Sequence, residues 1–138
     1  MDLGGTKLLT ALLDKQFEII AFEKEKMEIA KGANYFLELV SRSVHELLKQ
    51  AKIGRASLTA AGIGCAGVIN EKGTVVASPN LPFLEQFPMR KKLRHIFPGA
   101  LANHLLVIAK PFEEKMVYII EVASGNGFSF FVTIQRRD

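Results

Sequence analysis

The sequence predicts a mixed α/β domain, and three patterns lead to that prediction. Apolar residues alternate or run together over residues 7–14 and 17–27, which is typical of the two strands of a hairpin. Apolar residues recur at steps of three and four over residues 34–52, which indicates an amphipathic helix. Small apolar residues fill positions 58–69 and indicate a buried strand. A chain of 138 residues has the length of one domain, so residues 1–138 are expected to fold together.

The elements between and after these three are marked by turn residues. Gly54 is the expected end of the helix, and Asn70-Glu71-Lys72-Gly73 predicts a turn before a short returning strand. The remaining expected elements are a strand at 74–78, a basic helix opened by Phe87-Pro88, two apolar runs at 101–109 and 116–122, and a last strand at 128–135.

The charged residues do not favour a nucleic-acid partner. The net charge is +4, and the clearest basic cluster spans residues 90–95. Its cations flank apolar residues at helical spacing, so a solvated helix face explains them better than a nucleic-acid surface does. Nucleic-acid binding, which needs a basic stripe with a recognition motif, is the less favoured alternative.

Cys65 is the only cysteine, which excludes an internal disulfide and a cysteine-based zinc site. Its small apolar neighbours predict a buried thiol. No apolar run is long enough to span a bilayer, and no signal-type segment opens the chain. A cytoplasmic protein without a membrane partner is therefore expected.

The N-terminal segment carries the strongest chemical pattern. Asp2 is followed by Gly4, Gly5, Thr6 and Lys7 and then by an apolar run. Glycines allow positive φ angles and let backbone N–H groups approach an anion, and the threonine adds a hydroxyl donor. A carboxylate at Asp2 could hold a hydrated Mg²⁺ beside that anion. The pattern predicts a phosphate-holding turn between two strands.

Three motifs follow one another in order, at residues 2–7, 62–70 and 73–82. Each is weak alone, because short glycine-rich strings occur by chance. Together they resemble the N-terminal lobe of the ROK family, which includes bacterial glucokinases, other sugar kinases and sugar-responsive repressors. The resemblance covers about residues 2–97. It implies a single lobe of the ribonuclease-H-like, actin-like ATPase fold, with a mixed β-sheet and helices.

The resemblance also implies roles for individual residues. The turn from Gly4 to Lys7 would face the phosphates of ATP, and Asp2 would face its Mg²⁺. Gly67 would let the backbone approach a sugar, and Asn80 would hydrogen-bond a sugar hydroxyl, since an amide offers both a donor and an acceptor. An amide that only caps its own turn is the alternative for Asn80.

After residue 97 the match to the family weakens. Where the family has an Asn-Asp pair after a strand, with the Asp as catalytic base, the best counterpart is Asn103-His104. A histidine can act as a base near neutral pH. The favoured interpretation is that position 104 has lost the family's catalytic base. The family's second phosphate loop corresponds to Ser124, Gly125 and Gly127, followed by bulky phenylalanines that put nucleotide binding in doubt.

Neither the family's zinc cluster nor its second, adenine-binding lobe has a counterpart in this sequence. The first hypothesis is therefore a kinase-like lobe that does not phosphorylate sugar alone and retains weak binding of sugar or phosphate. The second is a regulatory or assembly module, with a homo-oligomer expected. The third is a sugar kinase completed by another chain, with His104 as base.

The position of the first motif raises a further expectation. Asp2 comes one residue after Met1, so little of a first strand precedes the turn. In the family fold that strand lies inside the sheet, and an empty position would leave backbone groups unpaired. We expect the position to be filled by the C-terminal strand, by a dimer partner or by upstream residues.

Overall fold

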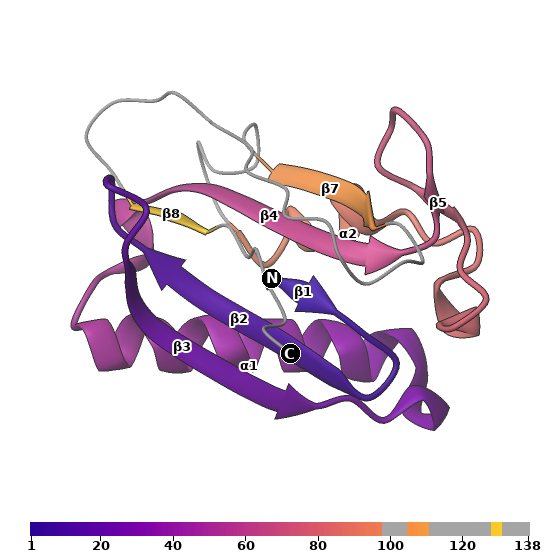
Figure 1. Ribbon diagram of the computed structural model, residues 1–138, viewed down its shortest axis with the longest axis horizontal. Coiled ribbons are helices and arrows are strands. Elements are labelled where there is room, and N and C mark those ends of the chain that lie inside the picture. The colour runs from indigo at the N-terminus through magenta and orange to yellow at the C-terminus, as the bar shows by residue number, and fades with distance from the viewer. Residues whose placement is uncertain (98–104, 111–127, 131–138) are drawn as a thin grey trace, which may run out of the picture.

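The computed structural model describes residues 1–97, 105–110 and 128–130, and a six-stranded sheet organises them (Figure 1). From one edge, β3 pairs with β2, a middle position follows, and β4 and β7 complete the order. The strands are β1 (Asp2–Leu3), β2 (Lys7–Leu13), β3 (Ile19–Lys26), β4 (Leu58–Ala66), β7 (Leu105–Lys110) and β8 (Phe128–Phe130). Both parallel and antiparallel pairs occur, which confirms the predicted mixed α/β class.

The hairpin expected from the alternating residues is present. β2 and β3 are antiparallel, with Lys7 opposite Lys26 and Leu12 opposite Ala21. The turn between them is fixed by Asp14, whose Oδ1 accepts hydrogen bonds from the backbone of Gln16 (2.8 Å) and Glu18 (3.0 Å). β2 is buried along both of its faces and β3 alternates in exposure, as expected for an inner strand beside an edge strand.

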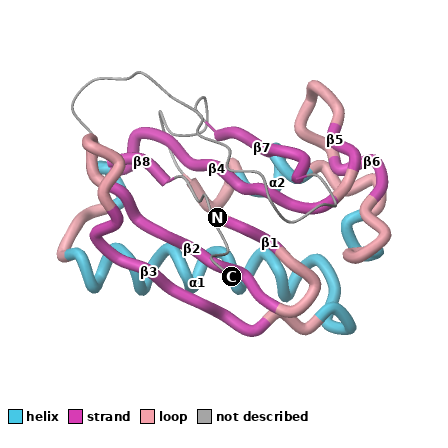
Figure 2. Tube along the Cα trace, in the orientation of Figure 1, coloured by secondary structure: helices cyan, strands magenta, loops and turns pink. Residues whose placement is uncertain are grey.

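Helix α1 (Gly32–Ala51) covers one face of the sheet and runs along β2 and β3 (Figure 2). An ion pair between Arg42 and Glu25 (3.0 Å) joins the helix to β3. Contrary to the prediction, Gly54 is not the residue that closes the helix. Lys52 takes the left-handed conformation instead, with φ 55° and ψ 41°. A left-handed residue commonly closes a helix, and here the lysine takes the place that glycine usually has.

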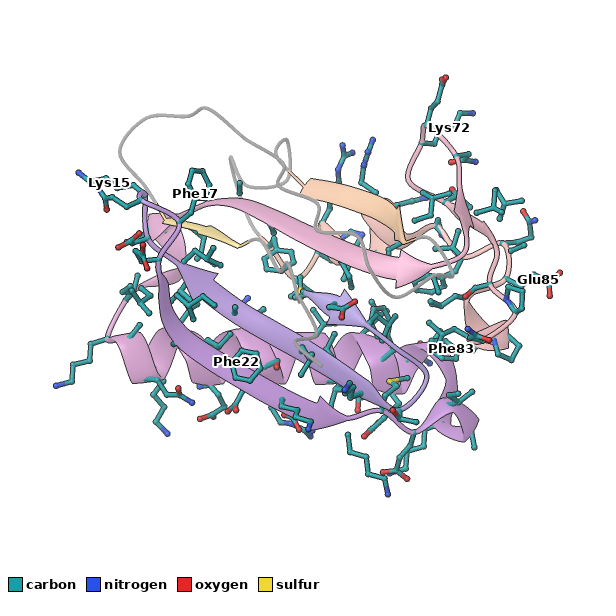
Figure 3. All side chains as sticks on the ribbon, viewed as in Figure 1. Lys15, Phe17, Phe22, Lys72, Phe83 and Glu85 are labelled. Carbon is teal, nitrogen blue, oxygen red and sulfur yellow. The ribbon has the colours of Figure 1, made fainter. Side chains whose placement is uncertain are left out.

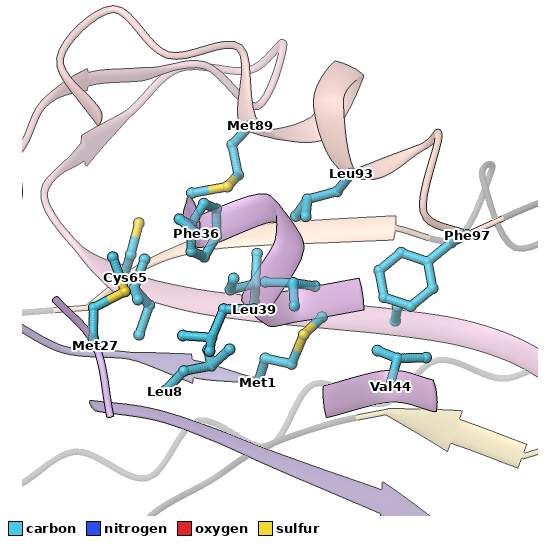
Figure 4. Close-up of a cluster of buried hydrophobic side chains, with 14 of the residues drawn as sticks. Met1, Leu8, Met27, Phe36, Leu39, Val44, Cys65, Met89, Leu93 and Phe97 are labelled. Atoms are coloured by element: carbon cyan, nitrogen blue, oxygen red, sulfur yellow. The ribbon is translucent and has the colours of Figure 1, made fainter. Parts of the chain in front are cut away.

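The core lies between α1 and the sheet and extends to the second, shorter helix (Figure 4). Phe36 of α1 is fully buried and contacts the rings of Phe83 and Phe87 at centroid distances of 6.1 and 6.4 Å. Cys65 is buried in the same core, as predicted. Other large, fully buried side chains include Phe97, Met1, Leu3, Leu8, Leu12, Leu39, Leu47, Ile63, Leu81 and Leu84.

The apolar segment predicted as one strand over 58–69 is divided at Gly67. β4 ends at Ala66, and β5 (Val68–Ile69) turns away to pair with β6 (Val75–Ala77) in a separate two-stranded sheet. The remaining short elements are η1 (Ile29–Lys31), η2 (Arg55–Ser57), η3 (Pro82–Leu84) and α2 (Met89–Leu93). Figure 3 shows the hairpin turn with Lys15 and the β5–β6 loop with Lys72 at opposite ends of the molecule.

Two segments share the middle position of the sheet. β1 lies between β2 and β4 at one end, with Asp2 opposite Leu9 and Gly64. β8 lies between the same strands at the other end, with Ser129 opposite Leu13 and Ala60. Both are antiparallel to β2 and parallel to β4. Of the three occupants expected for the place beside the short first strand, the structure has part of the C-terminal strand, residues 128–130.

In the part of the chain that the structure describes, no helix combines the length and the apolar character needed to cross a membrane.

Candidate functional site

The turn between β1 and β2 is the first half of the candidate site. The Gly4 N–H donates to the Lys7 carbonyl (2.9 Å), and the Met27 N–H donates to the Thr6 carbonyl (2.9 Å). These bonds fix the turn from both sides. Among the described residues, the amide groups of Gly5 and Thr6 have no acceptor. Two successive N–H groups without a protein partner are suited to an anion.

The glycines of this turn differ from the expectation in one respect. Neither Gly4 nor Gly5 has a positive φ angle. A Cβ added at Gly5 would lie 3.7 Å from Cδ1 of Ile29 and 3.8 Å from the carbonyl oxygen of Asn80, which are ordinary contacts. Packing therefore does not require glycine at position 5. The same distances show that the phosphate-type turn lies beside the loop that carries Asn80.

The polar side chains of the first motif are accessible at this edge of the sheet. Asp2 and Lys7 are half-buried and Thr6 is exposed. Asp2 stands at the carboxyl end of the middle sheet position, opposite Gly64 of β4. A carboxylate in the same short motif as a hydroxyl and a lysine has the chemistry to hold a hydrated Mg²⁺ with its phosphate, because Mg²⁺ keeps several waters and needs only one or two carboxylates.

Gly67 is a point of close backbone approach, as predicted, but the partner in the structure is the chain itself. Its φ is 154°, and an added Cβ would meet the Ala77 carbonyl oxygen at 2.5 Å and the Ser78 Cβ at 3.2 Å. The Ser78 hydroxyl donates to the Ala66 carbonyl (2.6 Å) and closes the same contact. Glycine is therefore required at position 67 by packing, and a sugar contact there stays a prediction.

Asn80 is exposed on the turn in which the Leu81 N–H donates to the Ser78 carbonyl (3.0 Å). Its side chain makes no hydrogen bond to the described residues, so it does not cap this turn. In contrast, Asn70 caps the neighbouring turn: its Oδ1 accepts hydrogen bonds from the backbone N–H groups of Lys72 (3.1 Å) and Thr74 (3.0 Å). The Asn80 amide is available to a ligand.

Sequence reasoning missed two residues that build the site. Ile29 packs beside Gly5, and Ser78 ties the end of β4 to the segment that carries Asn80. Ile29 lies outside the three motifs. Ser78 lies within the motif at 73–82, but no role was assigned to it from the sequence.

Five predicted site residues lie outside the described residues: Asn103, His104, Ser124, Gly125 and Gly127. The strand next to the proposed base is described. β7 begins at Leu105, opposite Ala61, and ends at Lys110, opposite Ala66. The place of Asn103 and His104 relative to a strand stays a prediction.

Within residues 1–97, 105–110 and 128–130, no group of three or more His, Cys, Asp or Glu side chains could hold a metal ion. The basic cluster has the form predicted from its spacing. Met89 and Leu93 of α2 are buried, while Lys91, Lys92 and Arg94 are exposed.

The comparisons with known proteins agree with this geometry. The family model described as the ROK family matches residues 1–100. The chain belongs to the ROK family. Its mixed sheet with helices is accordingly the actin-like ATPase fold of the ROK sugar kinases, represented here by part of a lobe.

Solved structures show the same fold at low sequence identity. The ROK hexokinase from Thermus thermophilus is 22% identical with a TM-score of 0.60, and it is matched over 79% of this chain and 33% of its own. A ROK glucokinase from Streptomyces griseus, in complex with glucose and AMPPNP, is 23% identical with a TM-score of 0.58, over 79% and 31%. A structure from Cytophaga hutchinsonii has a TM-score of 0.57 at 26% identity, over 78% and 34%.

This ROK chain spans about a third of the length of the solved structures that it matches. No curated protein matches it.

Proposed function

We propose that this ROK chain is a sugar-kinase-like lobe that binds a sugar and the phosphates of Mg²⁺-ATP weakly and does not transfer phosphate by itself. One observation carries the proposal: the turn at Gly5 lies beside the loop of Asn80. A Cβ added at Gly5 would lie 3.8 Å from the Asn80 carbonyl oxygen. Two motifs that are 75 positions apart, from 5 to 80, thus meet at one edge of the sheet.

The phosphate half of the site rests on backbone donors. The Gly5 and Thr6 amides have no acceptor among the described residues and are held by the bonds on either side of them. Donors that are already fixed lose little freedom when an anion binds. Asp2 would hold the Mg²⁺, which would neutralise phosphate charge and orient the terminal phosphate.

The sugar half rests on Asn80 and on the rigid loop beneath it. The exposed amide presents a donor and an acceptor, and the Ser78 and Gly67 contacts hold its loop against β4. A polyol needs such fixed polar partners, because its own hydroxyl groups lose water on binding.

Two features support binding without transfer. Positioning and electrostatic stabilisation supply nearly all of phosphoryl-transfer catalysis, and this chain spans about a third of the length of the kinases it matches. In addition, the sequence has His104 where the resemblance implies an Asp as the catalytic base.

The experiment is isothermal titration with glucose, N-acetylhexosamines and Mg²⁺-ATP, together with a coupled assay for sugar phosphorylation. We expect saturable heats for Mg²⁺-ATP and for at least one sugar, and no turnover above background. Asn80→Ala should weaken the sugar and leave Mg²⁺-ATP unchanged, because its amide is proposed to contact only the sugar.

Gln16→Ala is the matched control, since Gln16 is an exposed amide at the opposite end of the hairpin. Equal losses in Asn80→Ala and Gln16→Ala, or no binding of any of these ligands, would refute the proposal. Turnover that disappears in His104→Ala would instead establish the sugar kinase with His104 as base.

A further inference from the structure

The pair of residues that joins β2 to β3 next to the turn of the candidate site consists of two lysines. Lys7, the first residue of β2, lies directly opposite Lys26, the last residue of β3. Directly opposite residues of an antiparallel pair have Cβ atoms about 4.5–5.5 Å apart, and like charges at these positions destabilise the pair. Pairing of the two strands therefore does not explain why both residues are lysine.

Neither lysine forms an ion pair with a described residue. The carboxylates of Glu25 and Glu28 are close to Lys26 in the chain, but Glu25 is paired with a cation of α1 (3.0 Å) and Glu28 with a cation of η1 (2.9 Å). The hydrogen bond from the η1 lysine is the largest cause of the lowered pKa of Glu28, and the charge of Lys26 is the smallest. The positive charges of Lys7 and Lys26 are thus available to an anion.

Both lysines lie on the face of the sheet that points away from α1. Leu8, the next residue of β2, belongs to the core beneath α1, and side chains alternate along a strand, so Lys7 and Lys26 point to the other face. Asp2 shares that face, because it lies opposite Leu9, two residues from Lys7. The register thus places the carboxylate proposed for Mg²⁺ and the two lysines on one face, at the end of the sheet where the turn lies.

We infer that Lys26, together with Lys7, forms a phosphate subsite beside the turn, and that this subsite takes the phosphate chain of the nucleotide. The inference rests on the proposed function and adds a binding residue outside the three sequence motifs. The backbone there is fixed from two sides: the Lys26 carbonyl accepts a hydrogen bond from the Tyr35 hydroxyl (3.2 Å), and the Met27 N–H donates to the Thr6 carbonyl (2.9 Å). The exposed Lys26 side chain thus extends from a fixed position beside the turn.

The arrangement favours a chain of phosphates over a single phosphate. The turn offers the amides of Gly5 and Thr6, and the lysine pair adds two positive charges next to them. A lysine acts on phosphate as a point charge and needs no planar geometry. Successive phosphate groups can contact the amides and the ammonium groups at the same time, and they relieve the repulsion between the lysines. A sugar phosphate offers only one such group.

The test is isothermal titration at constant ionic strength with sodium tripolyphosphate, Mg²⁺-ATP and glucose 6-phosphate. Lys26→Gln should weaken tripolyphosphate and Mg²⁺-ATP by about three- to tenfold, the effect of one charge near the surface, and leave glucose unchanged. Lys26→Arg should restore most of the affinity, because it keeps the charge. Lys24→Gln is the matched control: it removes the same charge from an exposed position on the same strand and face, where Lys24 lies opposite Leu9.

The outcomes separate this inference from the proposed function. If the unaltered chain binds Mg²⁺-ATP and Lys26→Gln binds it equally well, the inference is overturned and the proposed function stands. Equal losses in Lys24→Gln and Lys26→Gln would reduce the effect to net charge and would also overturn the subsite. Weaker binding of glucose 6-phosphate alone would overturn the assignment to the nucleotide. An unaltered chain that binds none of these compounds and no sugar refutes both proposals.

A stability measurement tests the repulsion itself. Without an anion and at low salt, Lys26→Gln should raise the urea midpoint, because it removes a like-charge pair. Tripolyphosphate should raise the midpoint of the unaltered chain more than that of Lys26→Gln, since a ligand stabilises the fold according to its affinity. An equal rise in the two proteins would contradict the subsite.

Discussion

The two segments that form the candidate site contain glycine for different physical reasons. At Gly5 an added Cβ would make only ordinary contacts, at 3.7 and 3.8 Å, and φ is not positive. At Gly67 an added Cβ would meet a backbone oxygen at 2.5 Å. The fold explains the second glycine and does not explain the first.

This difference separates structural from functional glycines without reference to other sequences. A glycine that packing requires says little about a ligand, because the protein itself fills the space next to it. A glycine that packing does not require, in a turn whose two amides have no acceptor among the described residues, is a candidate for a role in ligand binding. The same reasoning groups Gly73 with Gly67, since Gly73 has φ 74° and lies against Arg90.

Gly67→Ala should have the largest effect on stability. Its methyl group would overlap the Ala77 carbonyl, a backbone group that cannot rotate away, so β4 or β6 must shift. Overpacking of this kind lowers the free energy of unfolding by about 1–3 kcal/mol. Urea denaturation followed by circular dichroism measures the change. A stability equal to that of the unaltered chain would remove the distinction between the two glycines.

Gly73→Ala should come next, with a loss of about 1–2 kcal/mol from the left-handed backbone and from contact with Arg90. Gly32→Ala is a comparison at a positive φ without crowding, because Gly32 has φ 73° with ψ −167° and nothing within 4 Å of an added Cβ. A larger loss at Gly73 than at Gly32 would indicate an effect of the contact with Arg90. No loss in Gly73→Ala would show that neither the backbone angle nor Arg90 requires glycine at position 73.

The elements governed by local periodicity could be predicted from the sequence. The hairpin and α1 follow from alternation at 7–14 and from the apolar spacing of residues such as Phe36 and Val40. The helix end could not, because Lys52 adopts a left-handed angle that lysine rarely takes while Gly54 stays extended. The position of β8 was expected only as one of three alternatives, since pairing between residues 60 and 129 depends on tertiary register.

In the candidate site too, some features could be predicted from residue types and others depend on how the chain folds. The anion-binding character of the turn at Gly5 and Thr6 follows from residue types, but its closeness to Asn80 depends on how β4, β5 and β6 fold back. The sequence predicted a close backbone approach at Gly67. It did not predict that the Ala77 carbonyl would be the approaching group, because Ala77 is brought there by the two-stranded sheet of β5 and β6.

Gly5→Ala should affect ligand binding more than stability. A methyl group fits without overlap, and the loss of backbone freedom in the unfolded chain should raise the free energy of unfolding by about 0.4–1 kcal/mol. The same methyl group lies between the turn and the Asn80 loop, where the ligand is proposed to bind, so Mg²⁺-ATP should bind more weakly by titration.

Gly54→Ala controls for the stability gain, because nothing lies within 4 Å of an added Cβ at Gly54 and the residue belongs to none of the three motifs. It should leave Mg²⁺-ATP binding unchanged. Unaltered binding in Gly5→Ala would show that the freedom at position 5 has no connection with a ligand.

The smallest effect is expected at the exposed ion pair next to Ile29, the residue that packs beside Gly5. The Lys31 ammonium donates a hydrogen bond to Glu28 (2.9 Å), which lowers the pKa of Glu28 below its usual 4.5. A lowered folded-state pKa stabilises the fold above the unfolded-state pKa, and this contribution is lost as the pH falls through the folded value. Lys31→Ala should therefore raise the pKa of Glu28 in an NMR titration while scarcely changing the urea midpoint at neutral pH, because exposed pairs contribute little.

Lys15→Ala, at the hairpin turn, should leave the Glu28 titration unchanged. A loss of Mg²⁺-ATP binding in Lys31→Ala would show that the ion pair positions Ile29 beside Gly5, and the turn would then depend on packing more than the contacts of Gly5 indicate.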